Sequence, residues 1–104
     1  MIGKDNECYN CGSTQWLETH HIFGGANRQK SDKYGLTVRL CHYCHNEPPN
    51  GAHHTREVME RVHKVGQIHA RAVLGWDADR FLKEIGRNYL GESEIEYIEK
   101  ELLK

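Results

Sequence analysis

The sequence predicts a small α+β protein that forms a single domain. Residues 16–23 contain β-branched and aromatic members, and residues 36–40 alternate apolar with polar, so both segments are expected to be strands. From Thr55 onwards, apolar residues recur at helical spacing. The chain has 104 residues, of which 38% are hydrophobic, so its core is small and a bound metal would help to stabilise it.

Four cysteines form two C-x2-C pairs, Cys8 with Cys11 and Cys41 with Cys44. Two intervening residues let one turn direct both thiolates at one ion, and two such turns supply the four ligands of a structural zinc site. Gly12 suits the positive φ that such a turn often requires. The alternatives are free thiols or a thioredoxin-like redox pair, but a redox pair is usually single and accompanies a βαβ pattern.

Histidines gather near these strands and cysteines. His20 and His21 lie near the end of the first predicted strand, where adjacent side chains point to opposite faces. One of them can therefore face a metal while the other faces a substrate, and residues 24–34 are expected to form a loop after them. The other clustered histidines are His42, His45, His53 and His54. Imidazole is the commonest ligand for borderline metals and a natural base near neutral pH.

Four motifs follow one another in order: Cys8-x2-Cys11, Glu18-Thr19-His20-His21-Ile22, Leu40-Cys41-x2-Cys44-His45 and Gly51-Ala52-His53. In this order they resemble the HNH family of endonucleases, the ββα-metal or His-Me finger nucleases, over residues 8–54. The closest likeness is to short phage-encoded members with a four-cysteine zinc. The resemblance implies a ββα-metal core over residues 1–56, stapled by the zinc site, and a metal-dependent DNA endonuclease. It also implies a phage or prophage origin and action in the cytoplasm of a bacterial host.

The resemblance implies a role for each clustered histidine. His21 takes the place of the general base, and His20 and His45 take the places of ligands to a catalytic divalent ion. The final family ligand corresponds to His53, with His54 as the alternative. His53 follows His45 by eight positions, with two prolines between them, so the identity of the third ligand stays open.

One family position departs from the pattern. Leu36 stands nine residues before His45, where the family has an Asn that braces the loop positioning the base. Either another residue braces this loop, with Asn27 as the candidate, or catalysis is weaker. The missing Asn is also the main argument for a second function, a catalytically degenerate zinc-ribbon module that binds nucleic acid or a protein partner. Such a module needs the cysteines but has no use for the clustered histidines.

Phosphodiester hydrolysis fits these residue types on chemical grounds as well. An imidazole with a pKa near 6.5 can take a proton from water at neutral pH. A divalent ion can polarise the phosphate and stabilise the departing 3′ oxygen. Nitrogen ligands favour Zn²⁺ or Ni²⁺, whereas water and phosphate oxygens in the shell admit Mg²⁺ or Mn²⁺. The resemblance implies products with 5′-phosphate and 3′-hydroxyl ends.

Local charge favours DNA as the partner. The formal net charge of −1 excludes a strongly polybasic arm as the main means of binding. Residues 28–39 nevertheless carry a net charge of +3 beside the proposed site. The predicted phosphate contacts in this stretch are Arg28, Lys30, Lys33 and Arg39.

The C-terminal part, residues 57–104, is expected to be a helical extension packed on the core. Helices are predicted over residues 55–74 and 78–86, with Asp77 capping the second, and a third opens at a Ser93-x-x-Glu96 capping box. Trp76 is expected to anchor the core. The last segment is acidic and unsuited to DNA, so it is either scaffold or a contact for a homodimer or for a phage or replication protein.

The sequence shows no sign of a membrane or secretory protein. It lacks an apolar run of roughly 20 residues and begins without the apolar core of a signal peptide. A cytoplasmic protein is therefore expected, and in that reducing compartment paired cysteines more often hold metal than form disulfides.

Overall fold

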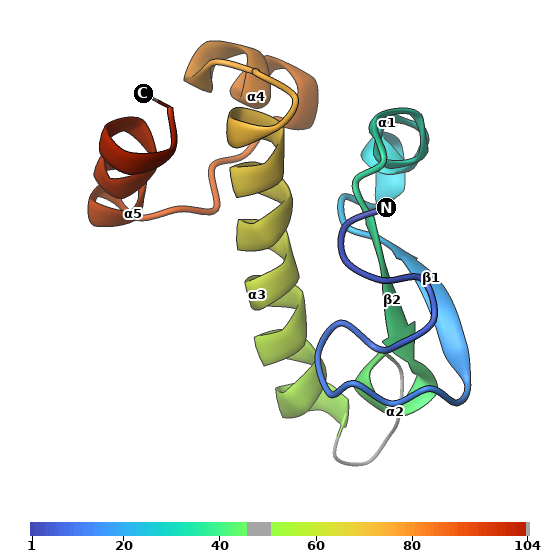
Figure 1. The fold of residues 1–104 in the computed structure, drawn as a ribbon. Coiled ribbons are helices and arrows are strands. Elements are labelled where there is room, and N and C mark those ends of the chain that lie inside the picture. Colours follow the sequence, from blue (N-terminus) through green and yellow to red (C-terminus); the bar gives the residue numbers. More distant parts are fainter. Residues whose placement is uncertain (46–50, 104) are drawn as a thin grey trace.

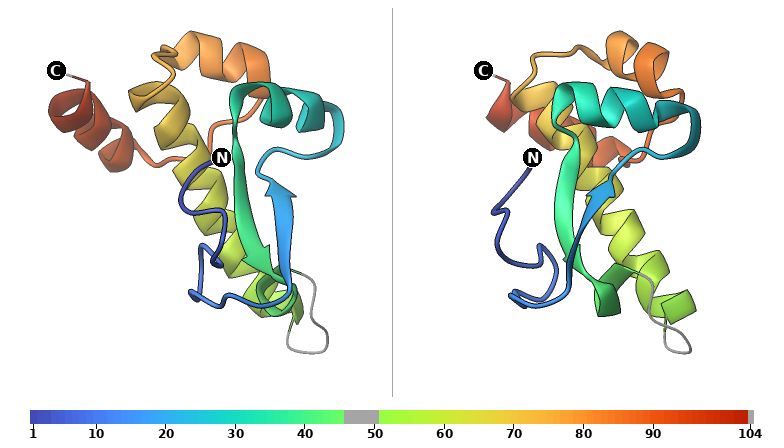
Figure 2. Two further views of the ribbon diagram at one scale, coloured as in Figure 1. Left: turned by 45° about the vertical axis from the view of Figure 1, so that its right-hand side comes forward. Right: turned by 90° about the vertical axis from the view of Figure 1, so that its right-hand side faces the viewer.

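The protein is built on a β-hairpin and one long helix. The computed structural model describes residues 1–45 and 51–103, without the side chains of residues 51–55. Strand β1 (Leu17–His21) pairs antiparallel with β2 (Thr37–Cys41), with Leu17 opposite Cys41 and His21 opposite Thr37. Helix α3 (Gly51–Ala72) runs alongside this hairpin (Figures 1 and 2). The predicted α+β class and both predicted strands are confirmed, with shifts of a residue or two at their ends.

The connection between the strands is more regular than expected. It contains a short 3₁₀ helix, η1 (Gly25–Asn27), and helix α1 (Arg28–Tyr34), so the expectation of a loop over residues 24–34 is wrong. Gly35 ends α1 with a φ of 69°, and the peptide N–H of Leu36 then donates to the carbonyl of Ser31 at 2.8 Å. This is a common way to end a helix, because glycine adopts positive φ without strain.

A short helix, α2 (His42–His45), follows β2 directly. Helix α3 starts four residues earlier than predicted, ends two residues earlier, and runs without a break across the expected boundary between residues 56 and 57. Its Gly66 lies against the segment that leaves β1, where an added Cβ would lie 2.7 Å from Cγ2 of Ile22. Glycine at this position therefore lets α3 approach the hairpin closely.

Three further elements complete the chain: α4 (Ala78–Ile85), α5 (Glu92–Tyr97) and a π-helical turn, η2 (Ile98–Leu102). Asp77 caps α4 as predicted, since its side chain accepts from the N–H of Arg80 at 2.7 Å. The predicted capping box at Ser93 is wrong. Instead, α5 begins after Gly91, whose N–H donates to the carboxylate of Glu94 at 2.9 Å.

The core lies between the hairpin, α3 and α4. Phe23 packs edge-to-face against Phe81. Trp76 packs edge-to-face against Tyr34 at a ring-centroid distance of 4.9 Å. Trp76 is buried, as expected for a core anchor. None of the described helices combines the length and apolar character needed to cross a bilayer.

Candidate active site and metal centre

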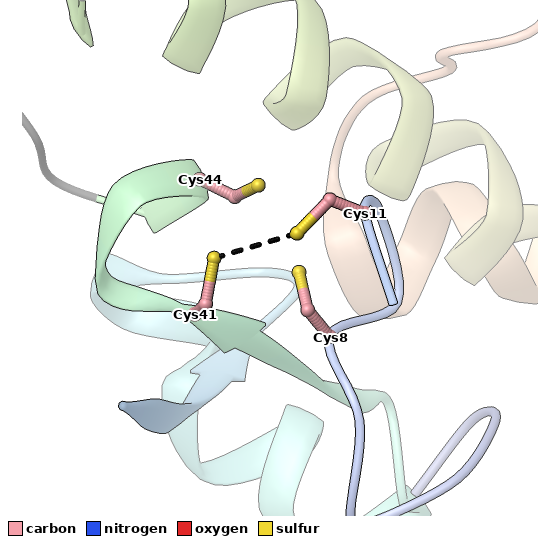
Figure 3. Close-up of side chains that lie close together, drawn as sticks. All are labelled: Cys8, Cys11, Cys41 and Cys44. Carbon is pink, nitrogen blue, oxygen red and sulfur yellow. Dashed lines mark hydrogen bonds between the residues drawn. The ribbon is translucent and has the colours of Figure 1, made fainter. Parts of the chain in front are cut away.

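The four cysteines converge on one point, as the paired spacing predicts. Their Sγ atoms all lie within 4.8 Å of one another, and those of Cys11 and Cys41 are 3.6 Å apart (Figure 3). A zinc ion bound tetrahedrally by four thiolates at about 2.3 Å would place the sulfurs about 3.8 Å apart. The cluster therefore has the donor set and nearly the spacing that zinc requires, and it can bind a structural metal.

Two short backbone structures present these sulfurs. In the first, the N–H of Gly12 donates to the carbonyl of Cys8 at 2.9 Å, and Gly12 has a φ of 79°, so the predicted positive φ is confirmed. The N–H of Tyr9 donates to the carbonyl of Arg39 at 2.7 Å, which fastens this turn to β2. The second structure is the passage from β2, which ends at Cys41, into α2, which carries Cys44.

The sulfurs differ in how readily they ionise. Burial opposes ionisation of Cys8, but peptide N–H groups at Cys41, Cys11 and Asn10 outweigh it and lower the pKa of this thiol to about 6. Burial raises the pKa of Cys44 well above its usual value, although the side-chain amide of Asn10 donates to this sulfur at 3.4 Å. A bound cation would neutralise the thiolates and so lower the free-energy cost of ionising the buried Cys44.

A second cluster joins the end of β1 to α2. Nδ1 of His20 lies 3.1 Å from Nε2 of His45. Both rings line a pocket of about 270 Å³ together with His21, Arg28 and the loop around Gly24. The structure thus brings together three of the predicted catalytic residues and one predicted phosphate contact. Unlike the cysteine cluster, this group faces an open cavity.

The spacing of the two imidazoles suits metal binding. Two nitrogens that bind one ion at about 2.0–2.1 Å lie about 3 Å apart. Burial, followed by the neighbouring histidines, lowers the pKa of His20 to about 4, so this ring is neutral at physiological pH. Its buried Nε2 has no hydrogen-bond partner. His20 and His45 supply two nitrogens, and among the described residues only the cysteine cluster brings three or more candidate ligands to one point.

Glu18 orients the histidines of α2, a role that the sequence analysis did not assign. One carboxylate oxygen accepts from Nδ1 of His45 at 2.7 Å, and the other accepts from Nδ1 of His42 at 3.2 Å. These hydrogen bonds lower the pKa of Glu18. With its proton on Nδ1, His45 presents the lone pair of Nε2, as in the carboxylate–histidine pairs of metal sites. Strand alternation, which places Glu18 on the face of His20, could have pointed to it.

Asp32 pairs with the predicted base. Its Oδ1 lies 2.8 Å from Nε2 of His21, a pairing that the net positive charge of residues 28–39 did not indicate. Asn27, the predicted brace of the loop, instead donates to the carbonyl of Ile85 at 2.9 Å. The buried hydroxyl of Ser31 bonds both the N–H and the carbonyl of Phe23, at 3.0 and 2.8 Å. Ser31 on α1, rather than Asn27, therefore holds the backbone of the segment that follows His21.

The four predicted phosphate contacts have different surroundings. Arg28 lines the histidine pocket, and within the described part of the chain its guanidinium has no ion-pair partner. Lys30 donates to the carbonyl of Glu84 at 2.7 Å, and Lys33 lies over the ring of Tyr34. Arg39 donates to Thr19 and to the carbonyl of Asp5. Arg28 is thus the basic residue best placed to meet a phosphate in the pocket.

The predicted third ligand lies outside the described side chains. His53 and the alternative His54 belong to the first turns of α3, whose start follows α2 in the chain. Comparison with models of known protein families, with curated proteins and with solved structures finds no significant match to this chain. The site must therefore be interpreted from its own geometry.

Proposed function

We propose that this protein is a metal-dependent DNA endonuclease of the ββα-metal type. The observation that carries this proposal is the contact of His20 with His45 on a pocket that also holds His21 and Arg28. The order of the elements supports it, because β1 carries His20 and His21, and α2, which follows β2 directly, carries His45, in the sequence order of the HNH resemblance.

His21 is the proposed general base. Its Nε2 faces the carboxylate of Asp32, which leaves Nδ1 as the nitrogen that accepts a proton from the attacking water. Asp32 would hold the ring in this tautomer and stabilise the imidazolium that forms. General-base assistance of this kind typically accelerates a reaction by about 10² to 10⁴-fold.

His20 and His45 are the proposed ligands of a divalent ion, with His53 as the expected third ligand and His54 as its alternative. Such an ion, when bound, supplies Lewis-acid stabilisation of the phosphate and of the leaving 3′ oxygen. Glu18 keeps His45 in the tautomer that can bind. Arg28 would hold a non-bridging oxygen of the phosphate, and DNA is the substrate that this charge and chemistry favour.

The four-cysteine cluster is proposed to hold a structural zinc ion that is separate from the catalytic one. Cys44 belongs to the cysteine cluster, and the next residue, His45, belongs to the pocket. Zinc bound at the cysteines would therefore fix α2 and, with it, one of the catalytic ligands.

A cleavage time course on plasmid and on single-stranded circular DNA tests the proposal. The purified protein is assayed with Mg²⁺, Mn²⁺, Ni²⁺ or Zn²⁺ and without added metal, beside His21→Ala and the control His69→Gln, which changes a histidine outside the pocket. We expect cleavage that needs added metal, is unchanged in His69→Gln and is at least about 10²-fold slower in His21→Ala. The His21→Ala variant should retain its zinc and its melting temperature.

Two results would contradict the proposal: no cleavage with any ion, or equal cleavage by His21→Ala. The cysteine cluster would then favour the second function, a non-catalytic zinc module that binds nucleic acid or a protein partner.

A further inference from the structure

Trp16 is exposed to an unusual degree. The residue is 80% exposed, more than any other large hydrophobic residue in the described part of the chain. Trp76, the other tryptophan, is 3% exposed. An isolated exposed hydrophobic residue is common on protein surfaces, but an indole costs more to leave in water than most.

The backbone holds this indole outward at a conformational cost. Trp16 has a φ of 54°, the one positive value at a non-glycine residue among those described. A bulky residue keeps such a conformation only where its surroundings impose it, and such residues cluster at functional sites. Here the carbonyl of Trp16 accepts from the N–H of His42 at 2.9 Å, which fixes the residue at the junction of β1 and α2.

Trp16 also forms one wall of a pocket beside the candidate active site. This pocket, of about 400 Å³, is lined by Trp16, Glu18 and His42. Glu18 joins it to the histidine pocket, because one of its oxygens accepts from His42 and the other accepts from His45. A strand of nucleic acid held at the histidines would therefore pass close to the indole.

We propose that Trp16 is a stacking platform for an unpaired base of the nucleic acid strand whose phosphate occupies the histidine pocket. This inference rests on the proposed nuclease function and specifies its substrate as DNA with a single-stranded region. In an intact duplex both faces of each base are already stacked on neighbouring bases. Only an unpaired base therefore has a free face that can stack on the indole. Stacking tolerates any base, since every base has a π-face.

Binding, measured apart from cleavage, tests this proposal. The full chain without added divalent ion is titrated into fluorescein-labelled oligodeoxythymidylate and into a labelled duplex of equal length, with anisotropy as the readout. We expect Trp16→Ala to weaken single-strand binding by about 5- to 150-fold and to leave duplex binding unchanged. Trp16→Phe, which keeps an aromatic face, should bind the single strand with an affinity between those of the native chain and of Trp16→Ala. Tyr97→Ala removes another exposed aromatic residue, on α5, and should bind like the native chain.

Tryptophan emission gives a second readout. The single strand should quench part of the emission of the native chain, and this quenching should be lost in Trp16→Ala, whose remaining indole is buried. Equal single-strand binding by native and Trp16→Ala proteins would overturn the proposal. Tryptophan emission that the single strand does not quench would also overturn it. A protein partner would then be the remaining occupant of the surface at Trp16. Plasmid cleavage with native dependence on His21 would show that the proposed nuclease function survives such a failure.

Discussion

The two clusters on the hairpin share an element but differ in form. Helix α2 gives Cys44 to one cluster and the next residue, His45, to the other. The cysteine cluster consists of four identical ligand types that converge on one point, enough to complete a tetrahedral coordination shell. The histidine cluster has mixed partners, each imidazole being held by a carboxylate or by another ring, and it opens on a cavity with an arginine. A closed four-ligand site is typical of structural metal, whereas chemistry requires an open position for water and substrate.

Removing one cysteine should give the largest effect. We expect Cys41→Ser to abolish metal binding and cooperative unfolding, because a small domain depends on the free energy of its structural metal, which is about 10–16 kcal/mol in zinc-finger peptides. Metal analysis of the purified protein and thermal melting by circular dichroism measure both effects. Ser13→Ala, a neighbouring change outside the cluster, should behave like the native chain. A Cys41→Ser protein that retains bound zinc and melts normally would contradict the closed-site interpretation.

Changing Glu18 should affect the open cluster without unfolding the protein. Glu18→Gln removes the charge that fixes His45, and partners of this kind typically contribute about 10- to 100-fold to metal affinity or activity. We therefore expect the metal concentration needed for half-maximal cleavage to rise by that factor, while the zinc content of the cysteine cluster stays unchanged.

Asp32→Asn is the matched change at the carboxylate that contacts His21. Because Asp32 contacts His21 and neither proposed metal ligand, it should lower the cleavage rate at saturating metal and leave the metal requirement unaltered. If both variants shifted the metal curve alike, the separate roles assigned to Glu18 and Asp32 would be wrong.

The comparison also shows what the sequence can reveal. Ligand spacing is a local property, so Cys8-x2-Cys11 and Cys41-x2-Cys44 predict their cluster directly. Residue composition likewise predicts the first strand, and alternation predicts the second. The partner of His21 depends on the fold of residues 24–34. Charge counting treated this segment as a basic loop, but it forms α1 and carries Asp32 to His21 from eleven positions away. Ser31 likewise braces the loop only because α1 buries it against Phe23.

Gly66 offers a test of the close contact between α3 and the segment that follows His21. Helical propensity alone predicts that Gly66→Ala stabilises the protein by about 0.5–1 kcal/mol. The structure predicts the opposite, a loss of about 1–3 kcal/mol, because the new Cβ would lie 2.7 Å from Ile22 and 3.0 Å from Phe23, directly after His21. Chemical denaturation measures the difference. Gly24→Ala, which meets no atom within 4 Å, is the control, and a more stable Gly66→Ala protein would refute the tight contact.

The smallest expected effect concerns His63, which lies on α3 and stacks on Tyr89 at a ring-centroid distance of 4.4 Å. Burial lowers the pKa of His63, against the opposing effect of the backbone at Ile22. Between that lowered pKa and the unfolded value of about 6.5, the unfolded chain binds more protons than the folded one. The contribution of His63 to the free energy of unfolding is therefore complete above about pH 6.5 and declines as the pH falls below it.

His63→Phe keeps an aromatic ring but removes this titration, so its free energy of unfolding should fall less steeply with acid below about pH 6.5. Urea denaturation over a series of pH values measures both slopes. Acid also protonates the cysteine ligands, but it does so in both proteins, and the difference between the slopes therefore isolates His63. Parallel curves would mean that His63 is as readily protonated in the folded protein as in the unfolded chain. The contacts of His63 with Phe23 and Tyr89 would then be looser than the structure indicates.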